Sequence, residues 1–280
     1  MADMVKQFMD VLEEFENNGI YYRHAIDEIP NAEEFLFHVH DRCEIFYFVS
    51  GKAQYLVEGS VYPLEAGSLL IMRPNEAHCV HIFSTERYER FAINFPFCLF
   101  DSFDPERRLM KPFFDRPLGK GNMYTLPGLD KTFQAMAQGV DEYEKHISLV
   151  TTLIKLVNMI NHEYAGHKIE VSHRNTLSEN LISYINEHLF EHLTIDILSK
   201  HFSLSNSQLR RIFKQSTGAT VWEYITAKRL EAAKVMLSGG SPANIAALQC
   251  GFNDYSSFYR AYIKRFGNSP TGNTTSQSSP

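Results

Sequence analysis

The stretch IAALQCGFNDYSSFYR, residues 245–260, contains the pattern that decides the fold of the second half of the chain. Residues 242–250 have the composition of a short helix, and the turn residues 251–254 follow it. Residues 255–266 then predict a second helix, which stops at Gly267. Two short helices joined by a tight turn, the second one basic, make up a helix-turn-helix unit.

The same arrangement occurs once earlier in the chain. Residues 194–202 predict a helix that begins at a threonine cap, residues 203–205 form a turn, and residues 206–216 predict a second helix that stops near Gly218. The pattern is helical throughout from Thr176 onward. The second half is therefore predicted to be an all-α domain with two helix-turn-helix units.

The second helix of each pair carries the charges and polar groups that DNA binding needs. Basic side chains can pair with phosphates or reach a guanine edge, and polar side chains at a helix start can exchange hydrogen bonds with bases. We expect DNA contacts from Ser205, Asn206, Ser207, Gln208, Arg210, Arg211, Lys214, Tyr255, Ser256, Ser257, Arg260 and Lys264. On spacing alone, the alternative is a helical bundle whose basic helices are merely solvated.

Charge is divided unequally between the two halves. Residues 1–171 hold 16 Lys and Arg against 26 Asp and Glu, a net charge of −10, whereas residues 172–280 hold 11 against 7, a net charge of +4. This asymmetry favours a nucleic-acid-binding module attached to something that is not one. Alone, it is equally compatible with a solvated basic face.

Residues 193–270 resemble the DNA-binding domain of the AraC/XylS regulators. The matching positions, at fixed offsets, are residues 195–202 together with Ser205, Leu209, Arg211, Phe213, Lys214, Gly218, Tyr224, Ile225, Arg229, Leu230, Ala233, Ile245, Ala246, Gly251, Phe252, Asp254, Ser256, Phe258, Arg260, Gly267, Asn268, Ser269 and Pro270. The resemblance implies that a linker helix over residues 220–237 holds both units in one rigid domain. It also implies that their second helices enter successive segments of the major groove.

The resemblance also assigns roles by position. It implies that phosphates are contacted by Lys214 and Lys264, and that bases are read by Ser207, Arg210, Arg211, Ser256, Ser257 and Arg260. The chain departs from the family at residues 262–263, where Tyr-Ile replaces a frequent Phe-Lys. A Ser/Thr-rich stretch at 271–280, expected to be a disordered tail, replaces the usual aromatic-Arg pair.

The first half has the pattern of a β-sandwich or barrel. From residue 34 to about residue 100, short runs rich in Phe, Tyr, Ile and Val are broken by turn residues at regular spacing. Residues 53–57 and 61–64 flank a Glu-Gly-Ser turn and predict a hairpin, and residues 68–72 predict the next strand. Residues 141–164 then predict a long amphipathic helix, which either packs on its own barrel or forms a dimer contact.

His38 and His40, followed by Glu44 and later by His78, resemble the two cupin motifs. Residues two apart on a strand face the same side, so His38 and His40 can both point into the barrel, with Glu44 reachable after a bend. Such a set can hold a divalent transition metal, or it can bind a sugar or a carboxylate without one. Structural histidines and catalysis are the remaining alternatives.

Two further side chains join the expected ligand-binding set. Tyr47 belongs to a group of aromatic residues that alternate between core and pocket, and an inward ring could stack on a sugar. Arg73 stands before a turn and could pair with an acidic ligand, with a surface role as the alternative. In this interpretation no cofactor is required for function.

The sequence therefore predicts an α+β multidomain protein, with a cupin-like β-barrel and helices before the all-α domain. We expect a ligand-binding and dimerisation domain over 1–165, a linker over 166–175, and an AraC-type DNA-binding domain over 176–270. No apolar run reaches the roughly 18 residues that cross a bilayer, and the start lacks a leader-like stretch, which predicts a cytoplasmic protein without membrane contact. The four widely spaced cysteines are expected to be reduced thiols.

The predicted function is ligand-responsive regulation of transcription rather than catalysis. The expected partners are double-stranded DNA, a second copy of the chain, a small effector and, for an activator, RNA polymerase. The resemblance implies that the effector is a sugar and that the regulated genes serve carbohydrate uptake or metabolism. The alternatives are a cupin metal-dependent enzyme or a metal sensor, each with a DNA-binding tail.

Overall fold

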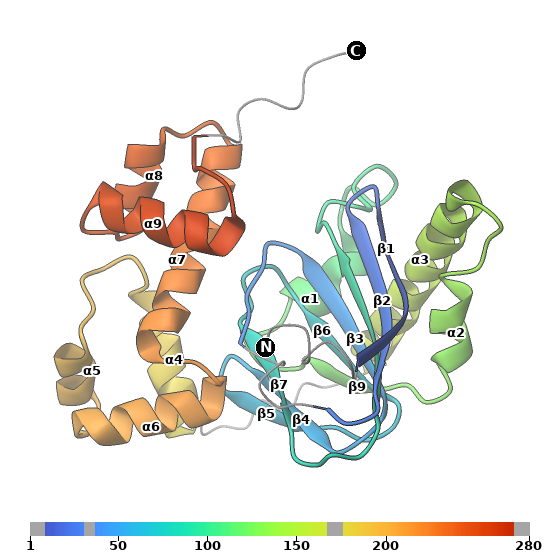
Figure 1. Ribbon diagram of the computed structural model, residues 1–280, viewed down its shortest axis with the longest axis horizontal. Coiled ribbons are helices and arrows are strands. Elements are labelled where there is room, and N and C mark those ends of the chain that lie inside the picture. Colours follow the sequence, from blue (N-terminus) through green and yellow to red (C-terminus); the bar gives the residue numbers. More distant parts are fainter. Residues whose placement is uncertain (1–8, 31–36, 167–175, 272–280) are drawn as a thin grey trace, which may run out of the picture.

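The computed structural model describes residues 9–30, 37–166 and 176–271 (Figure 1). A sheet-rich N-terminal domain is followed by a C-terminal domain of helices, which confirms the predicted fold class. The predicted linker at 166–175 and the predicted tail at 271–280 fall almost entirely outside the described residues.

The strands of the N-terminal domain form two antiparallel sheets. They are β1 (Met9–Asn17), β2 (Ile20–Asp27), β3 (Cys43–Ser50), β4 (Ala53–Val57), β5 (Ser60–Pro63), β6 (Ser68–Met72), β7 (His78–Ile82), β8 (Tyr88–Phe95) and β9 (Met123–Thr125). The larger sheet has the order β1-β2-β8-β3-β6-β9, and the smaller sheet has the order β5-β4-β7. The predicted hairpin, now β4 and β5, and the predicted strand over 68–72 are both confirmed.

Strand β3 shows how alternation separates the two cores of this domain. Ile45 and Tyr47 belong to the core on the outer face of the larger sheet. Phe46 and Phe48 belong to the core between the two sheets. Since successive residues of a strand face opposite sides, Glu44 shares the inner face with Phe46. Glu44 therefore lies inside the barrel, at one end of an apolar core.

Helices cover the outer face of the larger sheet, and the last two of them lie on the side away from the C-terminal domain (Figure 1). The segments η2 (Arg108–Met110) and α1 (Lys111–Phe114) precede α2 (Asp130–Ala135) and the long α3 (Glu142–Gly166). Helix α3 confirms the predicted amphipathic helix, and it buries Leu149, Leu153 and Leu156 against the sheet. Of its two predicted roles, packing on its own barrel is therefore observed.

The hairpin of β1 and β2 was missed in the sequence analysis. Asn18 and Gly19 join the two strands with φ values of 48° and 77°, the left-handed pair that a type I′ turn requires. Strand β1 contains four acidic residues in MDVLEEFEN, and acidic residues have low strand propensity, which hid the pattern. The Asn-Gly pair was the signal that could have revealed it.

The C-terminal domain contains the two predicted helix-turn-helix units. Its helices are α4 (Leu177–Glu187), α5 (Ile195–His201), α6 (Asn206–Thr217), α7 (Val221–Ser238), α8 (Ala243–Gln249) and α9 (Tyr255–Phe266). The first unit comprises α5 and α6, and the second comprises α8 and α9. Ser205 caps α6, Asp254 caps α9, and the left-handed glycines Gly218 and Gly267 end these two helices as predicted.

Helix α7 is the predicted linker helix, and its two halves belong to different units. Tyr224 and Ile225 lie in the core of the first unit, whereas Leu230 and Ala233 lie in the core of the second. Between them, the Arg229 guanidinium donates to carbonyl oxygens on the loops of both units at 2.6 to 2.7 Å. The two units are therefore joined into one domain around α7.

The barrel contributes side chains to the core of the first unit. Val39 and Ala77 are buried in that core, and Phe37 packs against it with its ring 5.7 Å from the ring of Tyr224. The smaller sheet lies between α4 and α6 on one side and the larger sheet on the other (Figure 1). The two domains are therefore joined by apolar packing as well as by polar contacts.

Two observations bear on cellular context. No helix within the described ranges is both long and apolar enough to cross a lipid bilayer. All four cysteines are free, with Cys43, Cys79 and Cys250 buried and Cys98 exposed.

Candidate nucleic-acid interface and ligand cluster

Helix α6 exposes one face that carries most of its predicted DNA contacts. Ser207, Arg210, Arg211 and Lys214 are all exposed and follow the three- and four-residue spacing of one helix face. The opposite face is buried in the core of the first unit. The helix therefore presents a hydroxyl and three cationic side chains to solvent.

The remaining predicted residues of the first unit hold its structure. Ser205 and Gln208 form a capping box, in which each side chain accepts from the other residue's backbone N–H. Asn206 donates from Nδ2 to Asp196 Oδ1 at 2.8 Å. These three side chains fix where α6 begins, and in this structure their polar groups are already engaged.

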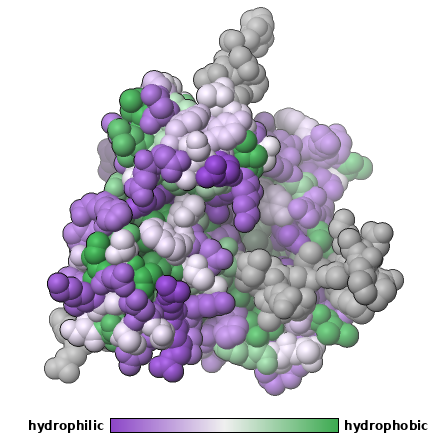
Figure 2. Space-filling view, turned by 60° about the vertical axis from the view of Figure 1, so that its left-hand side comes forward, coloured by the Kyte–Doolittle hydropathy of each residue, from purple (hydrophilic) through white to green (hydrophobic). Residues whose placement is uncertain are grey.

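Helix α9 has the corresponding exposed face in the second unit. Ser256, Arg260 and Lys264 are exposed, while Phe258 and Tyr262 fill the core behind them. The remaining two predicted residues make local contacts: Ser257 Oγ donates to Asp254 Oδ2 at 2.8 Å, and the ring of Tyr255 lies 5.9 Å from that of Phe258. Figure 2 turns this domain toward the viewer and shows a face that is hydrophilic over much of its area.

In the barrel, the structure brings together the four predicted cluster residues His38, His40, Glu44 and His78. One ligand atom from each lies within 4.8 Å of the others. His40 Nε2 is 2.9 Å from Glu44 Oε2, and His78 Nε2 is 3.4 Å from the same oxygen. His38 reaches the cluster through an isolated β-bridge to His78 rather than through a regular strand.

Burial differs sharply within the cluster. The side chains of His78 and Glu44 are 0% and 7% exposed, whereas His38 is exposed. Burial would raise the pKa of Glu44, but the nearby His78 and His40 outweigh it and hold that pKa well below its ordinary value. Glu44 is therefore an ionised carboxylate at the closed end of the site.

The two less exposed imidazoles, those of His40 and His78, are oriented by backbone carbonyls. His78 Nδ1 donates to Glu76 O at 2.6 Å, and His40 Nδ1 donates to Arg42 O at 3.1 Å. This arrangement directs both Nε2 atoms at Glu44. Among the described residues, the buried His78 Nε2 has no partner that meets hydrogen-bond geometry. An atom of this kind is suited to a ligand or a metal ion.

Two residues of the predicted ligand set lie away from the cluster. Tyr47 faces the outer core, where its ring stacks on Phe133 at 4.9 Å and its hydroxyl accepts from Leu129 N at 3.2 Å. Arg73 donates to the carbonyl oxygens of Phe114 and Arg116 at 3.3 and 3.2 Å. Strand alternation explains Tyr47, because it stands three positions after the inward-facing Glu44 on β3, and an odd offset puts its side chain on the opposite face. Neither residue lines the site in this structure.

Asn94, which sequence reasoning missed, contacts the cluster, and so does Tyr55, one of the aromatic residues expected to alternate between core and pocket. Asn94 Nδ2 donates to Glu44 Oε2 at 2.8 Å, and the Tyr55 hydroxyl donates to Glu44 Oε1 at 3.2 Å. Asn94 stands directly opposite Glu44 in the pairing of β3 with β8. The available signal was a polar residue within the alternating apolar pattern of β8. Only the register of β3 against β8 shows that this residue lies beside Glu44.

The family comparisons match the two domains of the chain separately. The model of a family described as an AraC-like ligand binding domain matches residues 22–149. A second family, described as a helix-turn-helix domain, matches residues 198–273. The first range includes the whole histidine cluster, and the second includes α6 and α9 with their exposed faces.

Several curated relatives are regulators of transcription. The HTH-type transcriptional activator RhaR of Salmonella dublin is 23% identical over 261 residues, which cover 88% of each chain. The uncharacterized HTH-type transcriptional regulator YfiF of Bacillus subtilis is 24% identical, over 89% of this chain and 82% of its own. The probable transcriptional regulator LumQ of Photobacterium leiognathi is 36% identical over 90 residues, about a third of its length.

Solved structures of similar proteins include ToxT and AdpA. An apo ToxT variant from Vibrio cholerae covers 91% of this chain and 97% of its own, with 13% identity and a TM-score of 0.41. The DNA-binding domain of AdpA, in complex with a target DNA, covers 33% of this chain and 84% of its own, with 22% identity and a TM-score of 0.32. Together, the two family matches and the full-length relatives show that the chain belongs to the AraC family of ligand-responsive, DNA-binding transcription regulators.

Proposed function

We propose that the barrel binds a small polyhydroxylated effector, of the carbohydrate class, at the histidine cluster, and that binding changes how the two helix-turn-helix units engage DNA. The observation that supports this proposal is the cluster itself. Glu44 is an ionised, buried carboxylate with His40, His78, Asn94 and Tyr55 around it, at one end of the apolar core between the two sheets.

The chemistry of the cluster favours hydroxyl groups as the ligand. A sugar hydroxyl both donates and accepts, so it can donate to Glu44 and accept from Asn94 or from an imidazole N–H. The ring of Tyr55 lies 5.9 Å from the imidazole of His78 and 4.7 Å from the ring of Phe46, which gives the site an aromatic wall. A small-molecule site typically places a small number of polar groups among apolar and aromatic side chains.

We also propose that a divalent transition-metal ion takes part in effector binding. The donor set fits such an ion, because it offers three imidazoles and one carboxylate, and carbonyls already hold the Nδ1 atoms of His40 and His78. When bound, the ion would polarise an oxygen of the effector. The rival proposals, a cupin metalloenzyme or a metal sensor with a DNA-binding tail, place the same ion at the same residues.

The experiment that tests the effector class is a DNA-binding titration on the full-length protein, with DNA from upstream of its own gene and a panel of sugars. We expect one sugar to change the DNA affinity at least about tenfold, or 1.4 kcal/mol. The variant with His38, His40 and Glu44 replaced by Ala should still bind DNA but should lose that response. DNA binding without any sugar response would refute the carbohydrate class alone, and turnover of a substrate would favour the enzyme.

The proposed assembly is a homodimer in the cytoplasm, formed through α3. Tyr143 and Ile147 are exposed on one side of this helix, opposite the leucines that pack on the sheet, and Tyr143 is 73% exposed. Pairing with a second copy would bury them and would place up to four helix-turn-helix units on double-stranded DNA. An activator would in addition contact RNA polymerase. Sedimentation of wild type and of Tyr143→Glu tests the dimer, since the charge should shift the protein toward monomer.

A further inference from the structure

Helix α7 exposes a short stripe of side chains near its start. Trp222 and Thr226 are four residues apart and so lie on the same face of the helix, with Glu223 beside them. Trp222 is 50% exposed, whereas its neighbours Val221 and Tyr224 are buried. The only tryptophan of the chain therefore leaves about half of a large, mostly apolar surface in solvent.

A cavity of about 570 Å³ lies beside this stripe, between the first half of α7 and the end of α9. Trp222 and Leu230 of α7 line it together with Lys264 of α9. Three alanines complete much of the lining, and their short side chains leave room for an occupant: Ala219, Ala227 and Ala261. The cavity therefore offers an apolar surface with charged groups at a few positions.

The charges at this cavity favour an anionic partner. Lys264 and Arg265 line it, and Glu223 is the one acidic side chain among the lining residues. The hydrogen bonds from Thr220, which α7 uses as its cap, lower the pKa of Glu223. The ammonium groups of Lys214 and Lys264 lower this pKa further, so both lysines lie near the same carboxylate.

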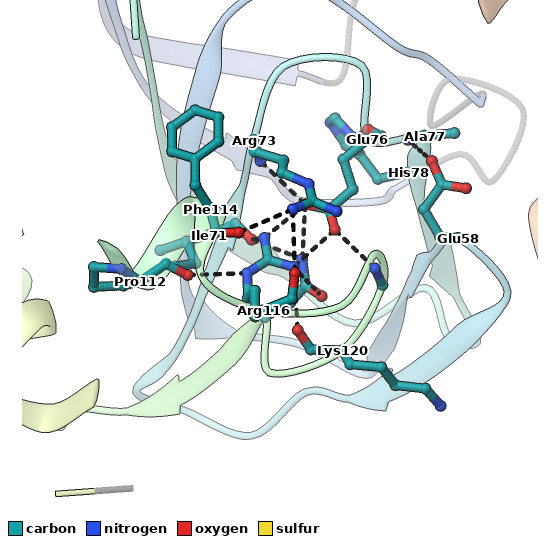
Figure 3. A network of polar contacts seen from close by, with 12 residues as sticks. Glu58, Ile71, Arg73, Glu76, Ala77, His78, Pro112, Phe114, Arg116 and Lys120 are labelled. Atoms are coloured by element: carbon teal, nitrogen blue, oxygen red, sulfur yellow. Dashed lines mark hydrogen bonds and ion pairs between the residues drawn. The ribbon is translucent and has the colours of Figure 1, made fainter. Parts of the chain in front are cut away.

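The barrel closes one side of the cavity through Phe37. The next residue, His38, exchanges two backbone hydrogen bonds with His78, each of 3.0 Å. Two residues before His78, the buried carboxylate of Glu76 accepts from both Nη atoms of Arg116 at 2.8 and 2.7 Å (Figure 3). The wall at Phe37 is thus bonded to a buried network of the barrel, and the cavity is a preformed feature of the joined domains.

The stripe lies between the two faces that carry the predicted DNA contacts. Lys214 belongs to the exposed face of α6 and Lys264 to that of α9. When α6 and α9 occupy successive segments of the major groove, the minor groove between those segments passes the stretch that joins the two helices. The start of α7 is part of that stretch, because Glu223 lies near both lysines. Trp222 directly precedes Glu223 and lines the same cavity.

We infer that Trp222 contacts the sugar-phosphate backbone that borders this minor groove, with the adjacent cavity receiving the strand and Lys264 neutralising one of its phosphates. The apolar face of an indole packs on deoxyribose, and its Nε1–H donates to a phosphate oxygen. The carboxylate of Glu223 repels the same strand and limits the affinity. Backbone contacts carry no base information, so this surface acts alike on DNA of any sequence. The inference stands on DNA binding by α6 and α9 and is independent of the effector site.

Tryptophan fluorescence of the full-length protein tests the contact, since Trp222 is the only indole. A saturating duplex from upstream of the protein's own gene should lower the acrylamide quenching constant at least about twofold, because the strand covers the ring. The control is the double variant Trp222→Phe with Val235→Trp, which moves the indole to an exposed position on nearly the opposite side of α7. Its quenching should not respond to DNA. Equal protection of both indoles, or protection of neither, would overturn the inference.

DNA affinity gives a second readout of the same contact. Trp222→Ala should weaken binding about tenfold, the effect of losing roughly 60 Å² of apolar contact. The factor should be the same for the upstream duplex and for an unrelated duplex of equal length. Val235→Ala, with a similar exposed fraction on the same helix, should leave both affinities unchanged. Unchanged affinity of Trp222→Ala, or a loss confined to the upstream duplex, would overturn a backbone contact.

Glu223→Gln tests the position of the stripe without disturbing the helix, because glutamine also serves at the third position of a capping box. Removing the repulsion should raise the affinity for both duplexes about two- to fivefold at low salt. The gain should shrink as salt is added. Glu142→Gln, an exposed position of α3 on the barrel, makes the same change in net charge and should give no gain. Equal gains from the two variants, or none from Glu223→Gln, would contradict the placement of the strand.

Discussion

Glu58 at the tip of the β4–β5 hairpin and Lys228 in the middle of α7 form a buried ion pair across the boundary between the domains. Their Oε1 and Nζ atoms are 2.6 Å apart. The same carboxylate also accepts from Ala77 N and from Asn186 Nδ2 at 2.7 and 3.0 Å, so its remaining lone pairs are satisfied. The pair ties a turn of the barrel to the helix that holds both DNA-binding units.

Removing the charge of Glu58 should be strongly destabilising. Glu58→Gln leaves the Lys228 ammonium buried without its counter-ion, and breaking a buried pair in this way costs about 3–5 kcal/mol. Denaturant unfolding of the full-length protein measures the loss. Glu86→Gln is the matched control, because its pair with Lys52 is more than half exposed, and it should leave the free energy of unfolding unchanged. Equal effects of the two variants would contradict the assigned role of Glu58.

Arg211→Ala and Arg260→Ala should each weaken specific DNA binding by about 1–3 kcal/mol if these side chains read guanine. Both lie on exposed faces of the second helix of a unit, and neither supports a core. Affinity titrations at fixed salt measure the loss, and Lys155→Ala, at an exposed position of α3, is the control. If about six phosphates are neutralised by each domain, the log-log salt slope should be near −5. Unchanged affinity in both Arg variants would argue against this mode of binding.

Metal analysis of the purified protein should find one divalent transition-metal ion per chain. Glu44→Gln or His78→Ala should abolish it, since each removes one of the buried ligands. His81→Ala, on the exposed side of the same strand as His78, should retain it. Free metal at a hundred times its Kd should raise the unfolding free energy by about 2.7 kcal/mol. A metal-free protein that gains no stability from added metal would eliminate the ion from the site.

Two glycines in left-handed conformation give a controlled comparison. A Cβ at Gly218 would lie 2.8 Å from Cys79 Sγ of the barrel, whereas one at Gly267 has no atom of the described chain within 4 Å. Gly267→Ala should therefore cost only the left-handed strain, about 1–2 kcal/mol, and Gly218→Ala should cost more. Denaturant unfolding of both variants measures the difference. A Gly218→Ala loss no larger than that of Gly267→Ala would show that the two domains can separate there without cost.

The sequence sufficed for features that depend on local signals. The caps Ser205 and Asp254 and the glycines Gly218 and Gly267 mark the ends of α6 and α9 within a few residues. The exposed position of Arg211 then follows from helical spacing. The four cluster residues were also found, because the pattern of histidines and a carboxylate is visible without knowing the register.

Features that depend on register or on distant contacts were not predictable in this way. Tyr47 was placed at the site although it faces the outer core, since an error of one position along a strand reverses the side. Asn94 was missed because only the pairing of β3 with β8 sets it beside Glu44. The contact of Glu58 with Lys228 joins residues far apart in the chain, and no local pattern at either position indicates the other.

The presence of Val39 and Ala77 in the core of the first helix-turn-helix unit has a consequence for how such regulators can be recombined. A foreign DNA-binding domain grafted onto this barrel would meet two side chains shaped for a different partner. A hybrid gene that preserves the junction must therefore carry the segments around residues 37–41 and 76–79 along with the helices. In this architecture, the set of residues that packs the DNA-binding domain extends beyond that domain and into the barrel.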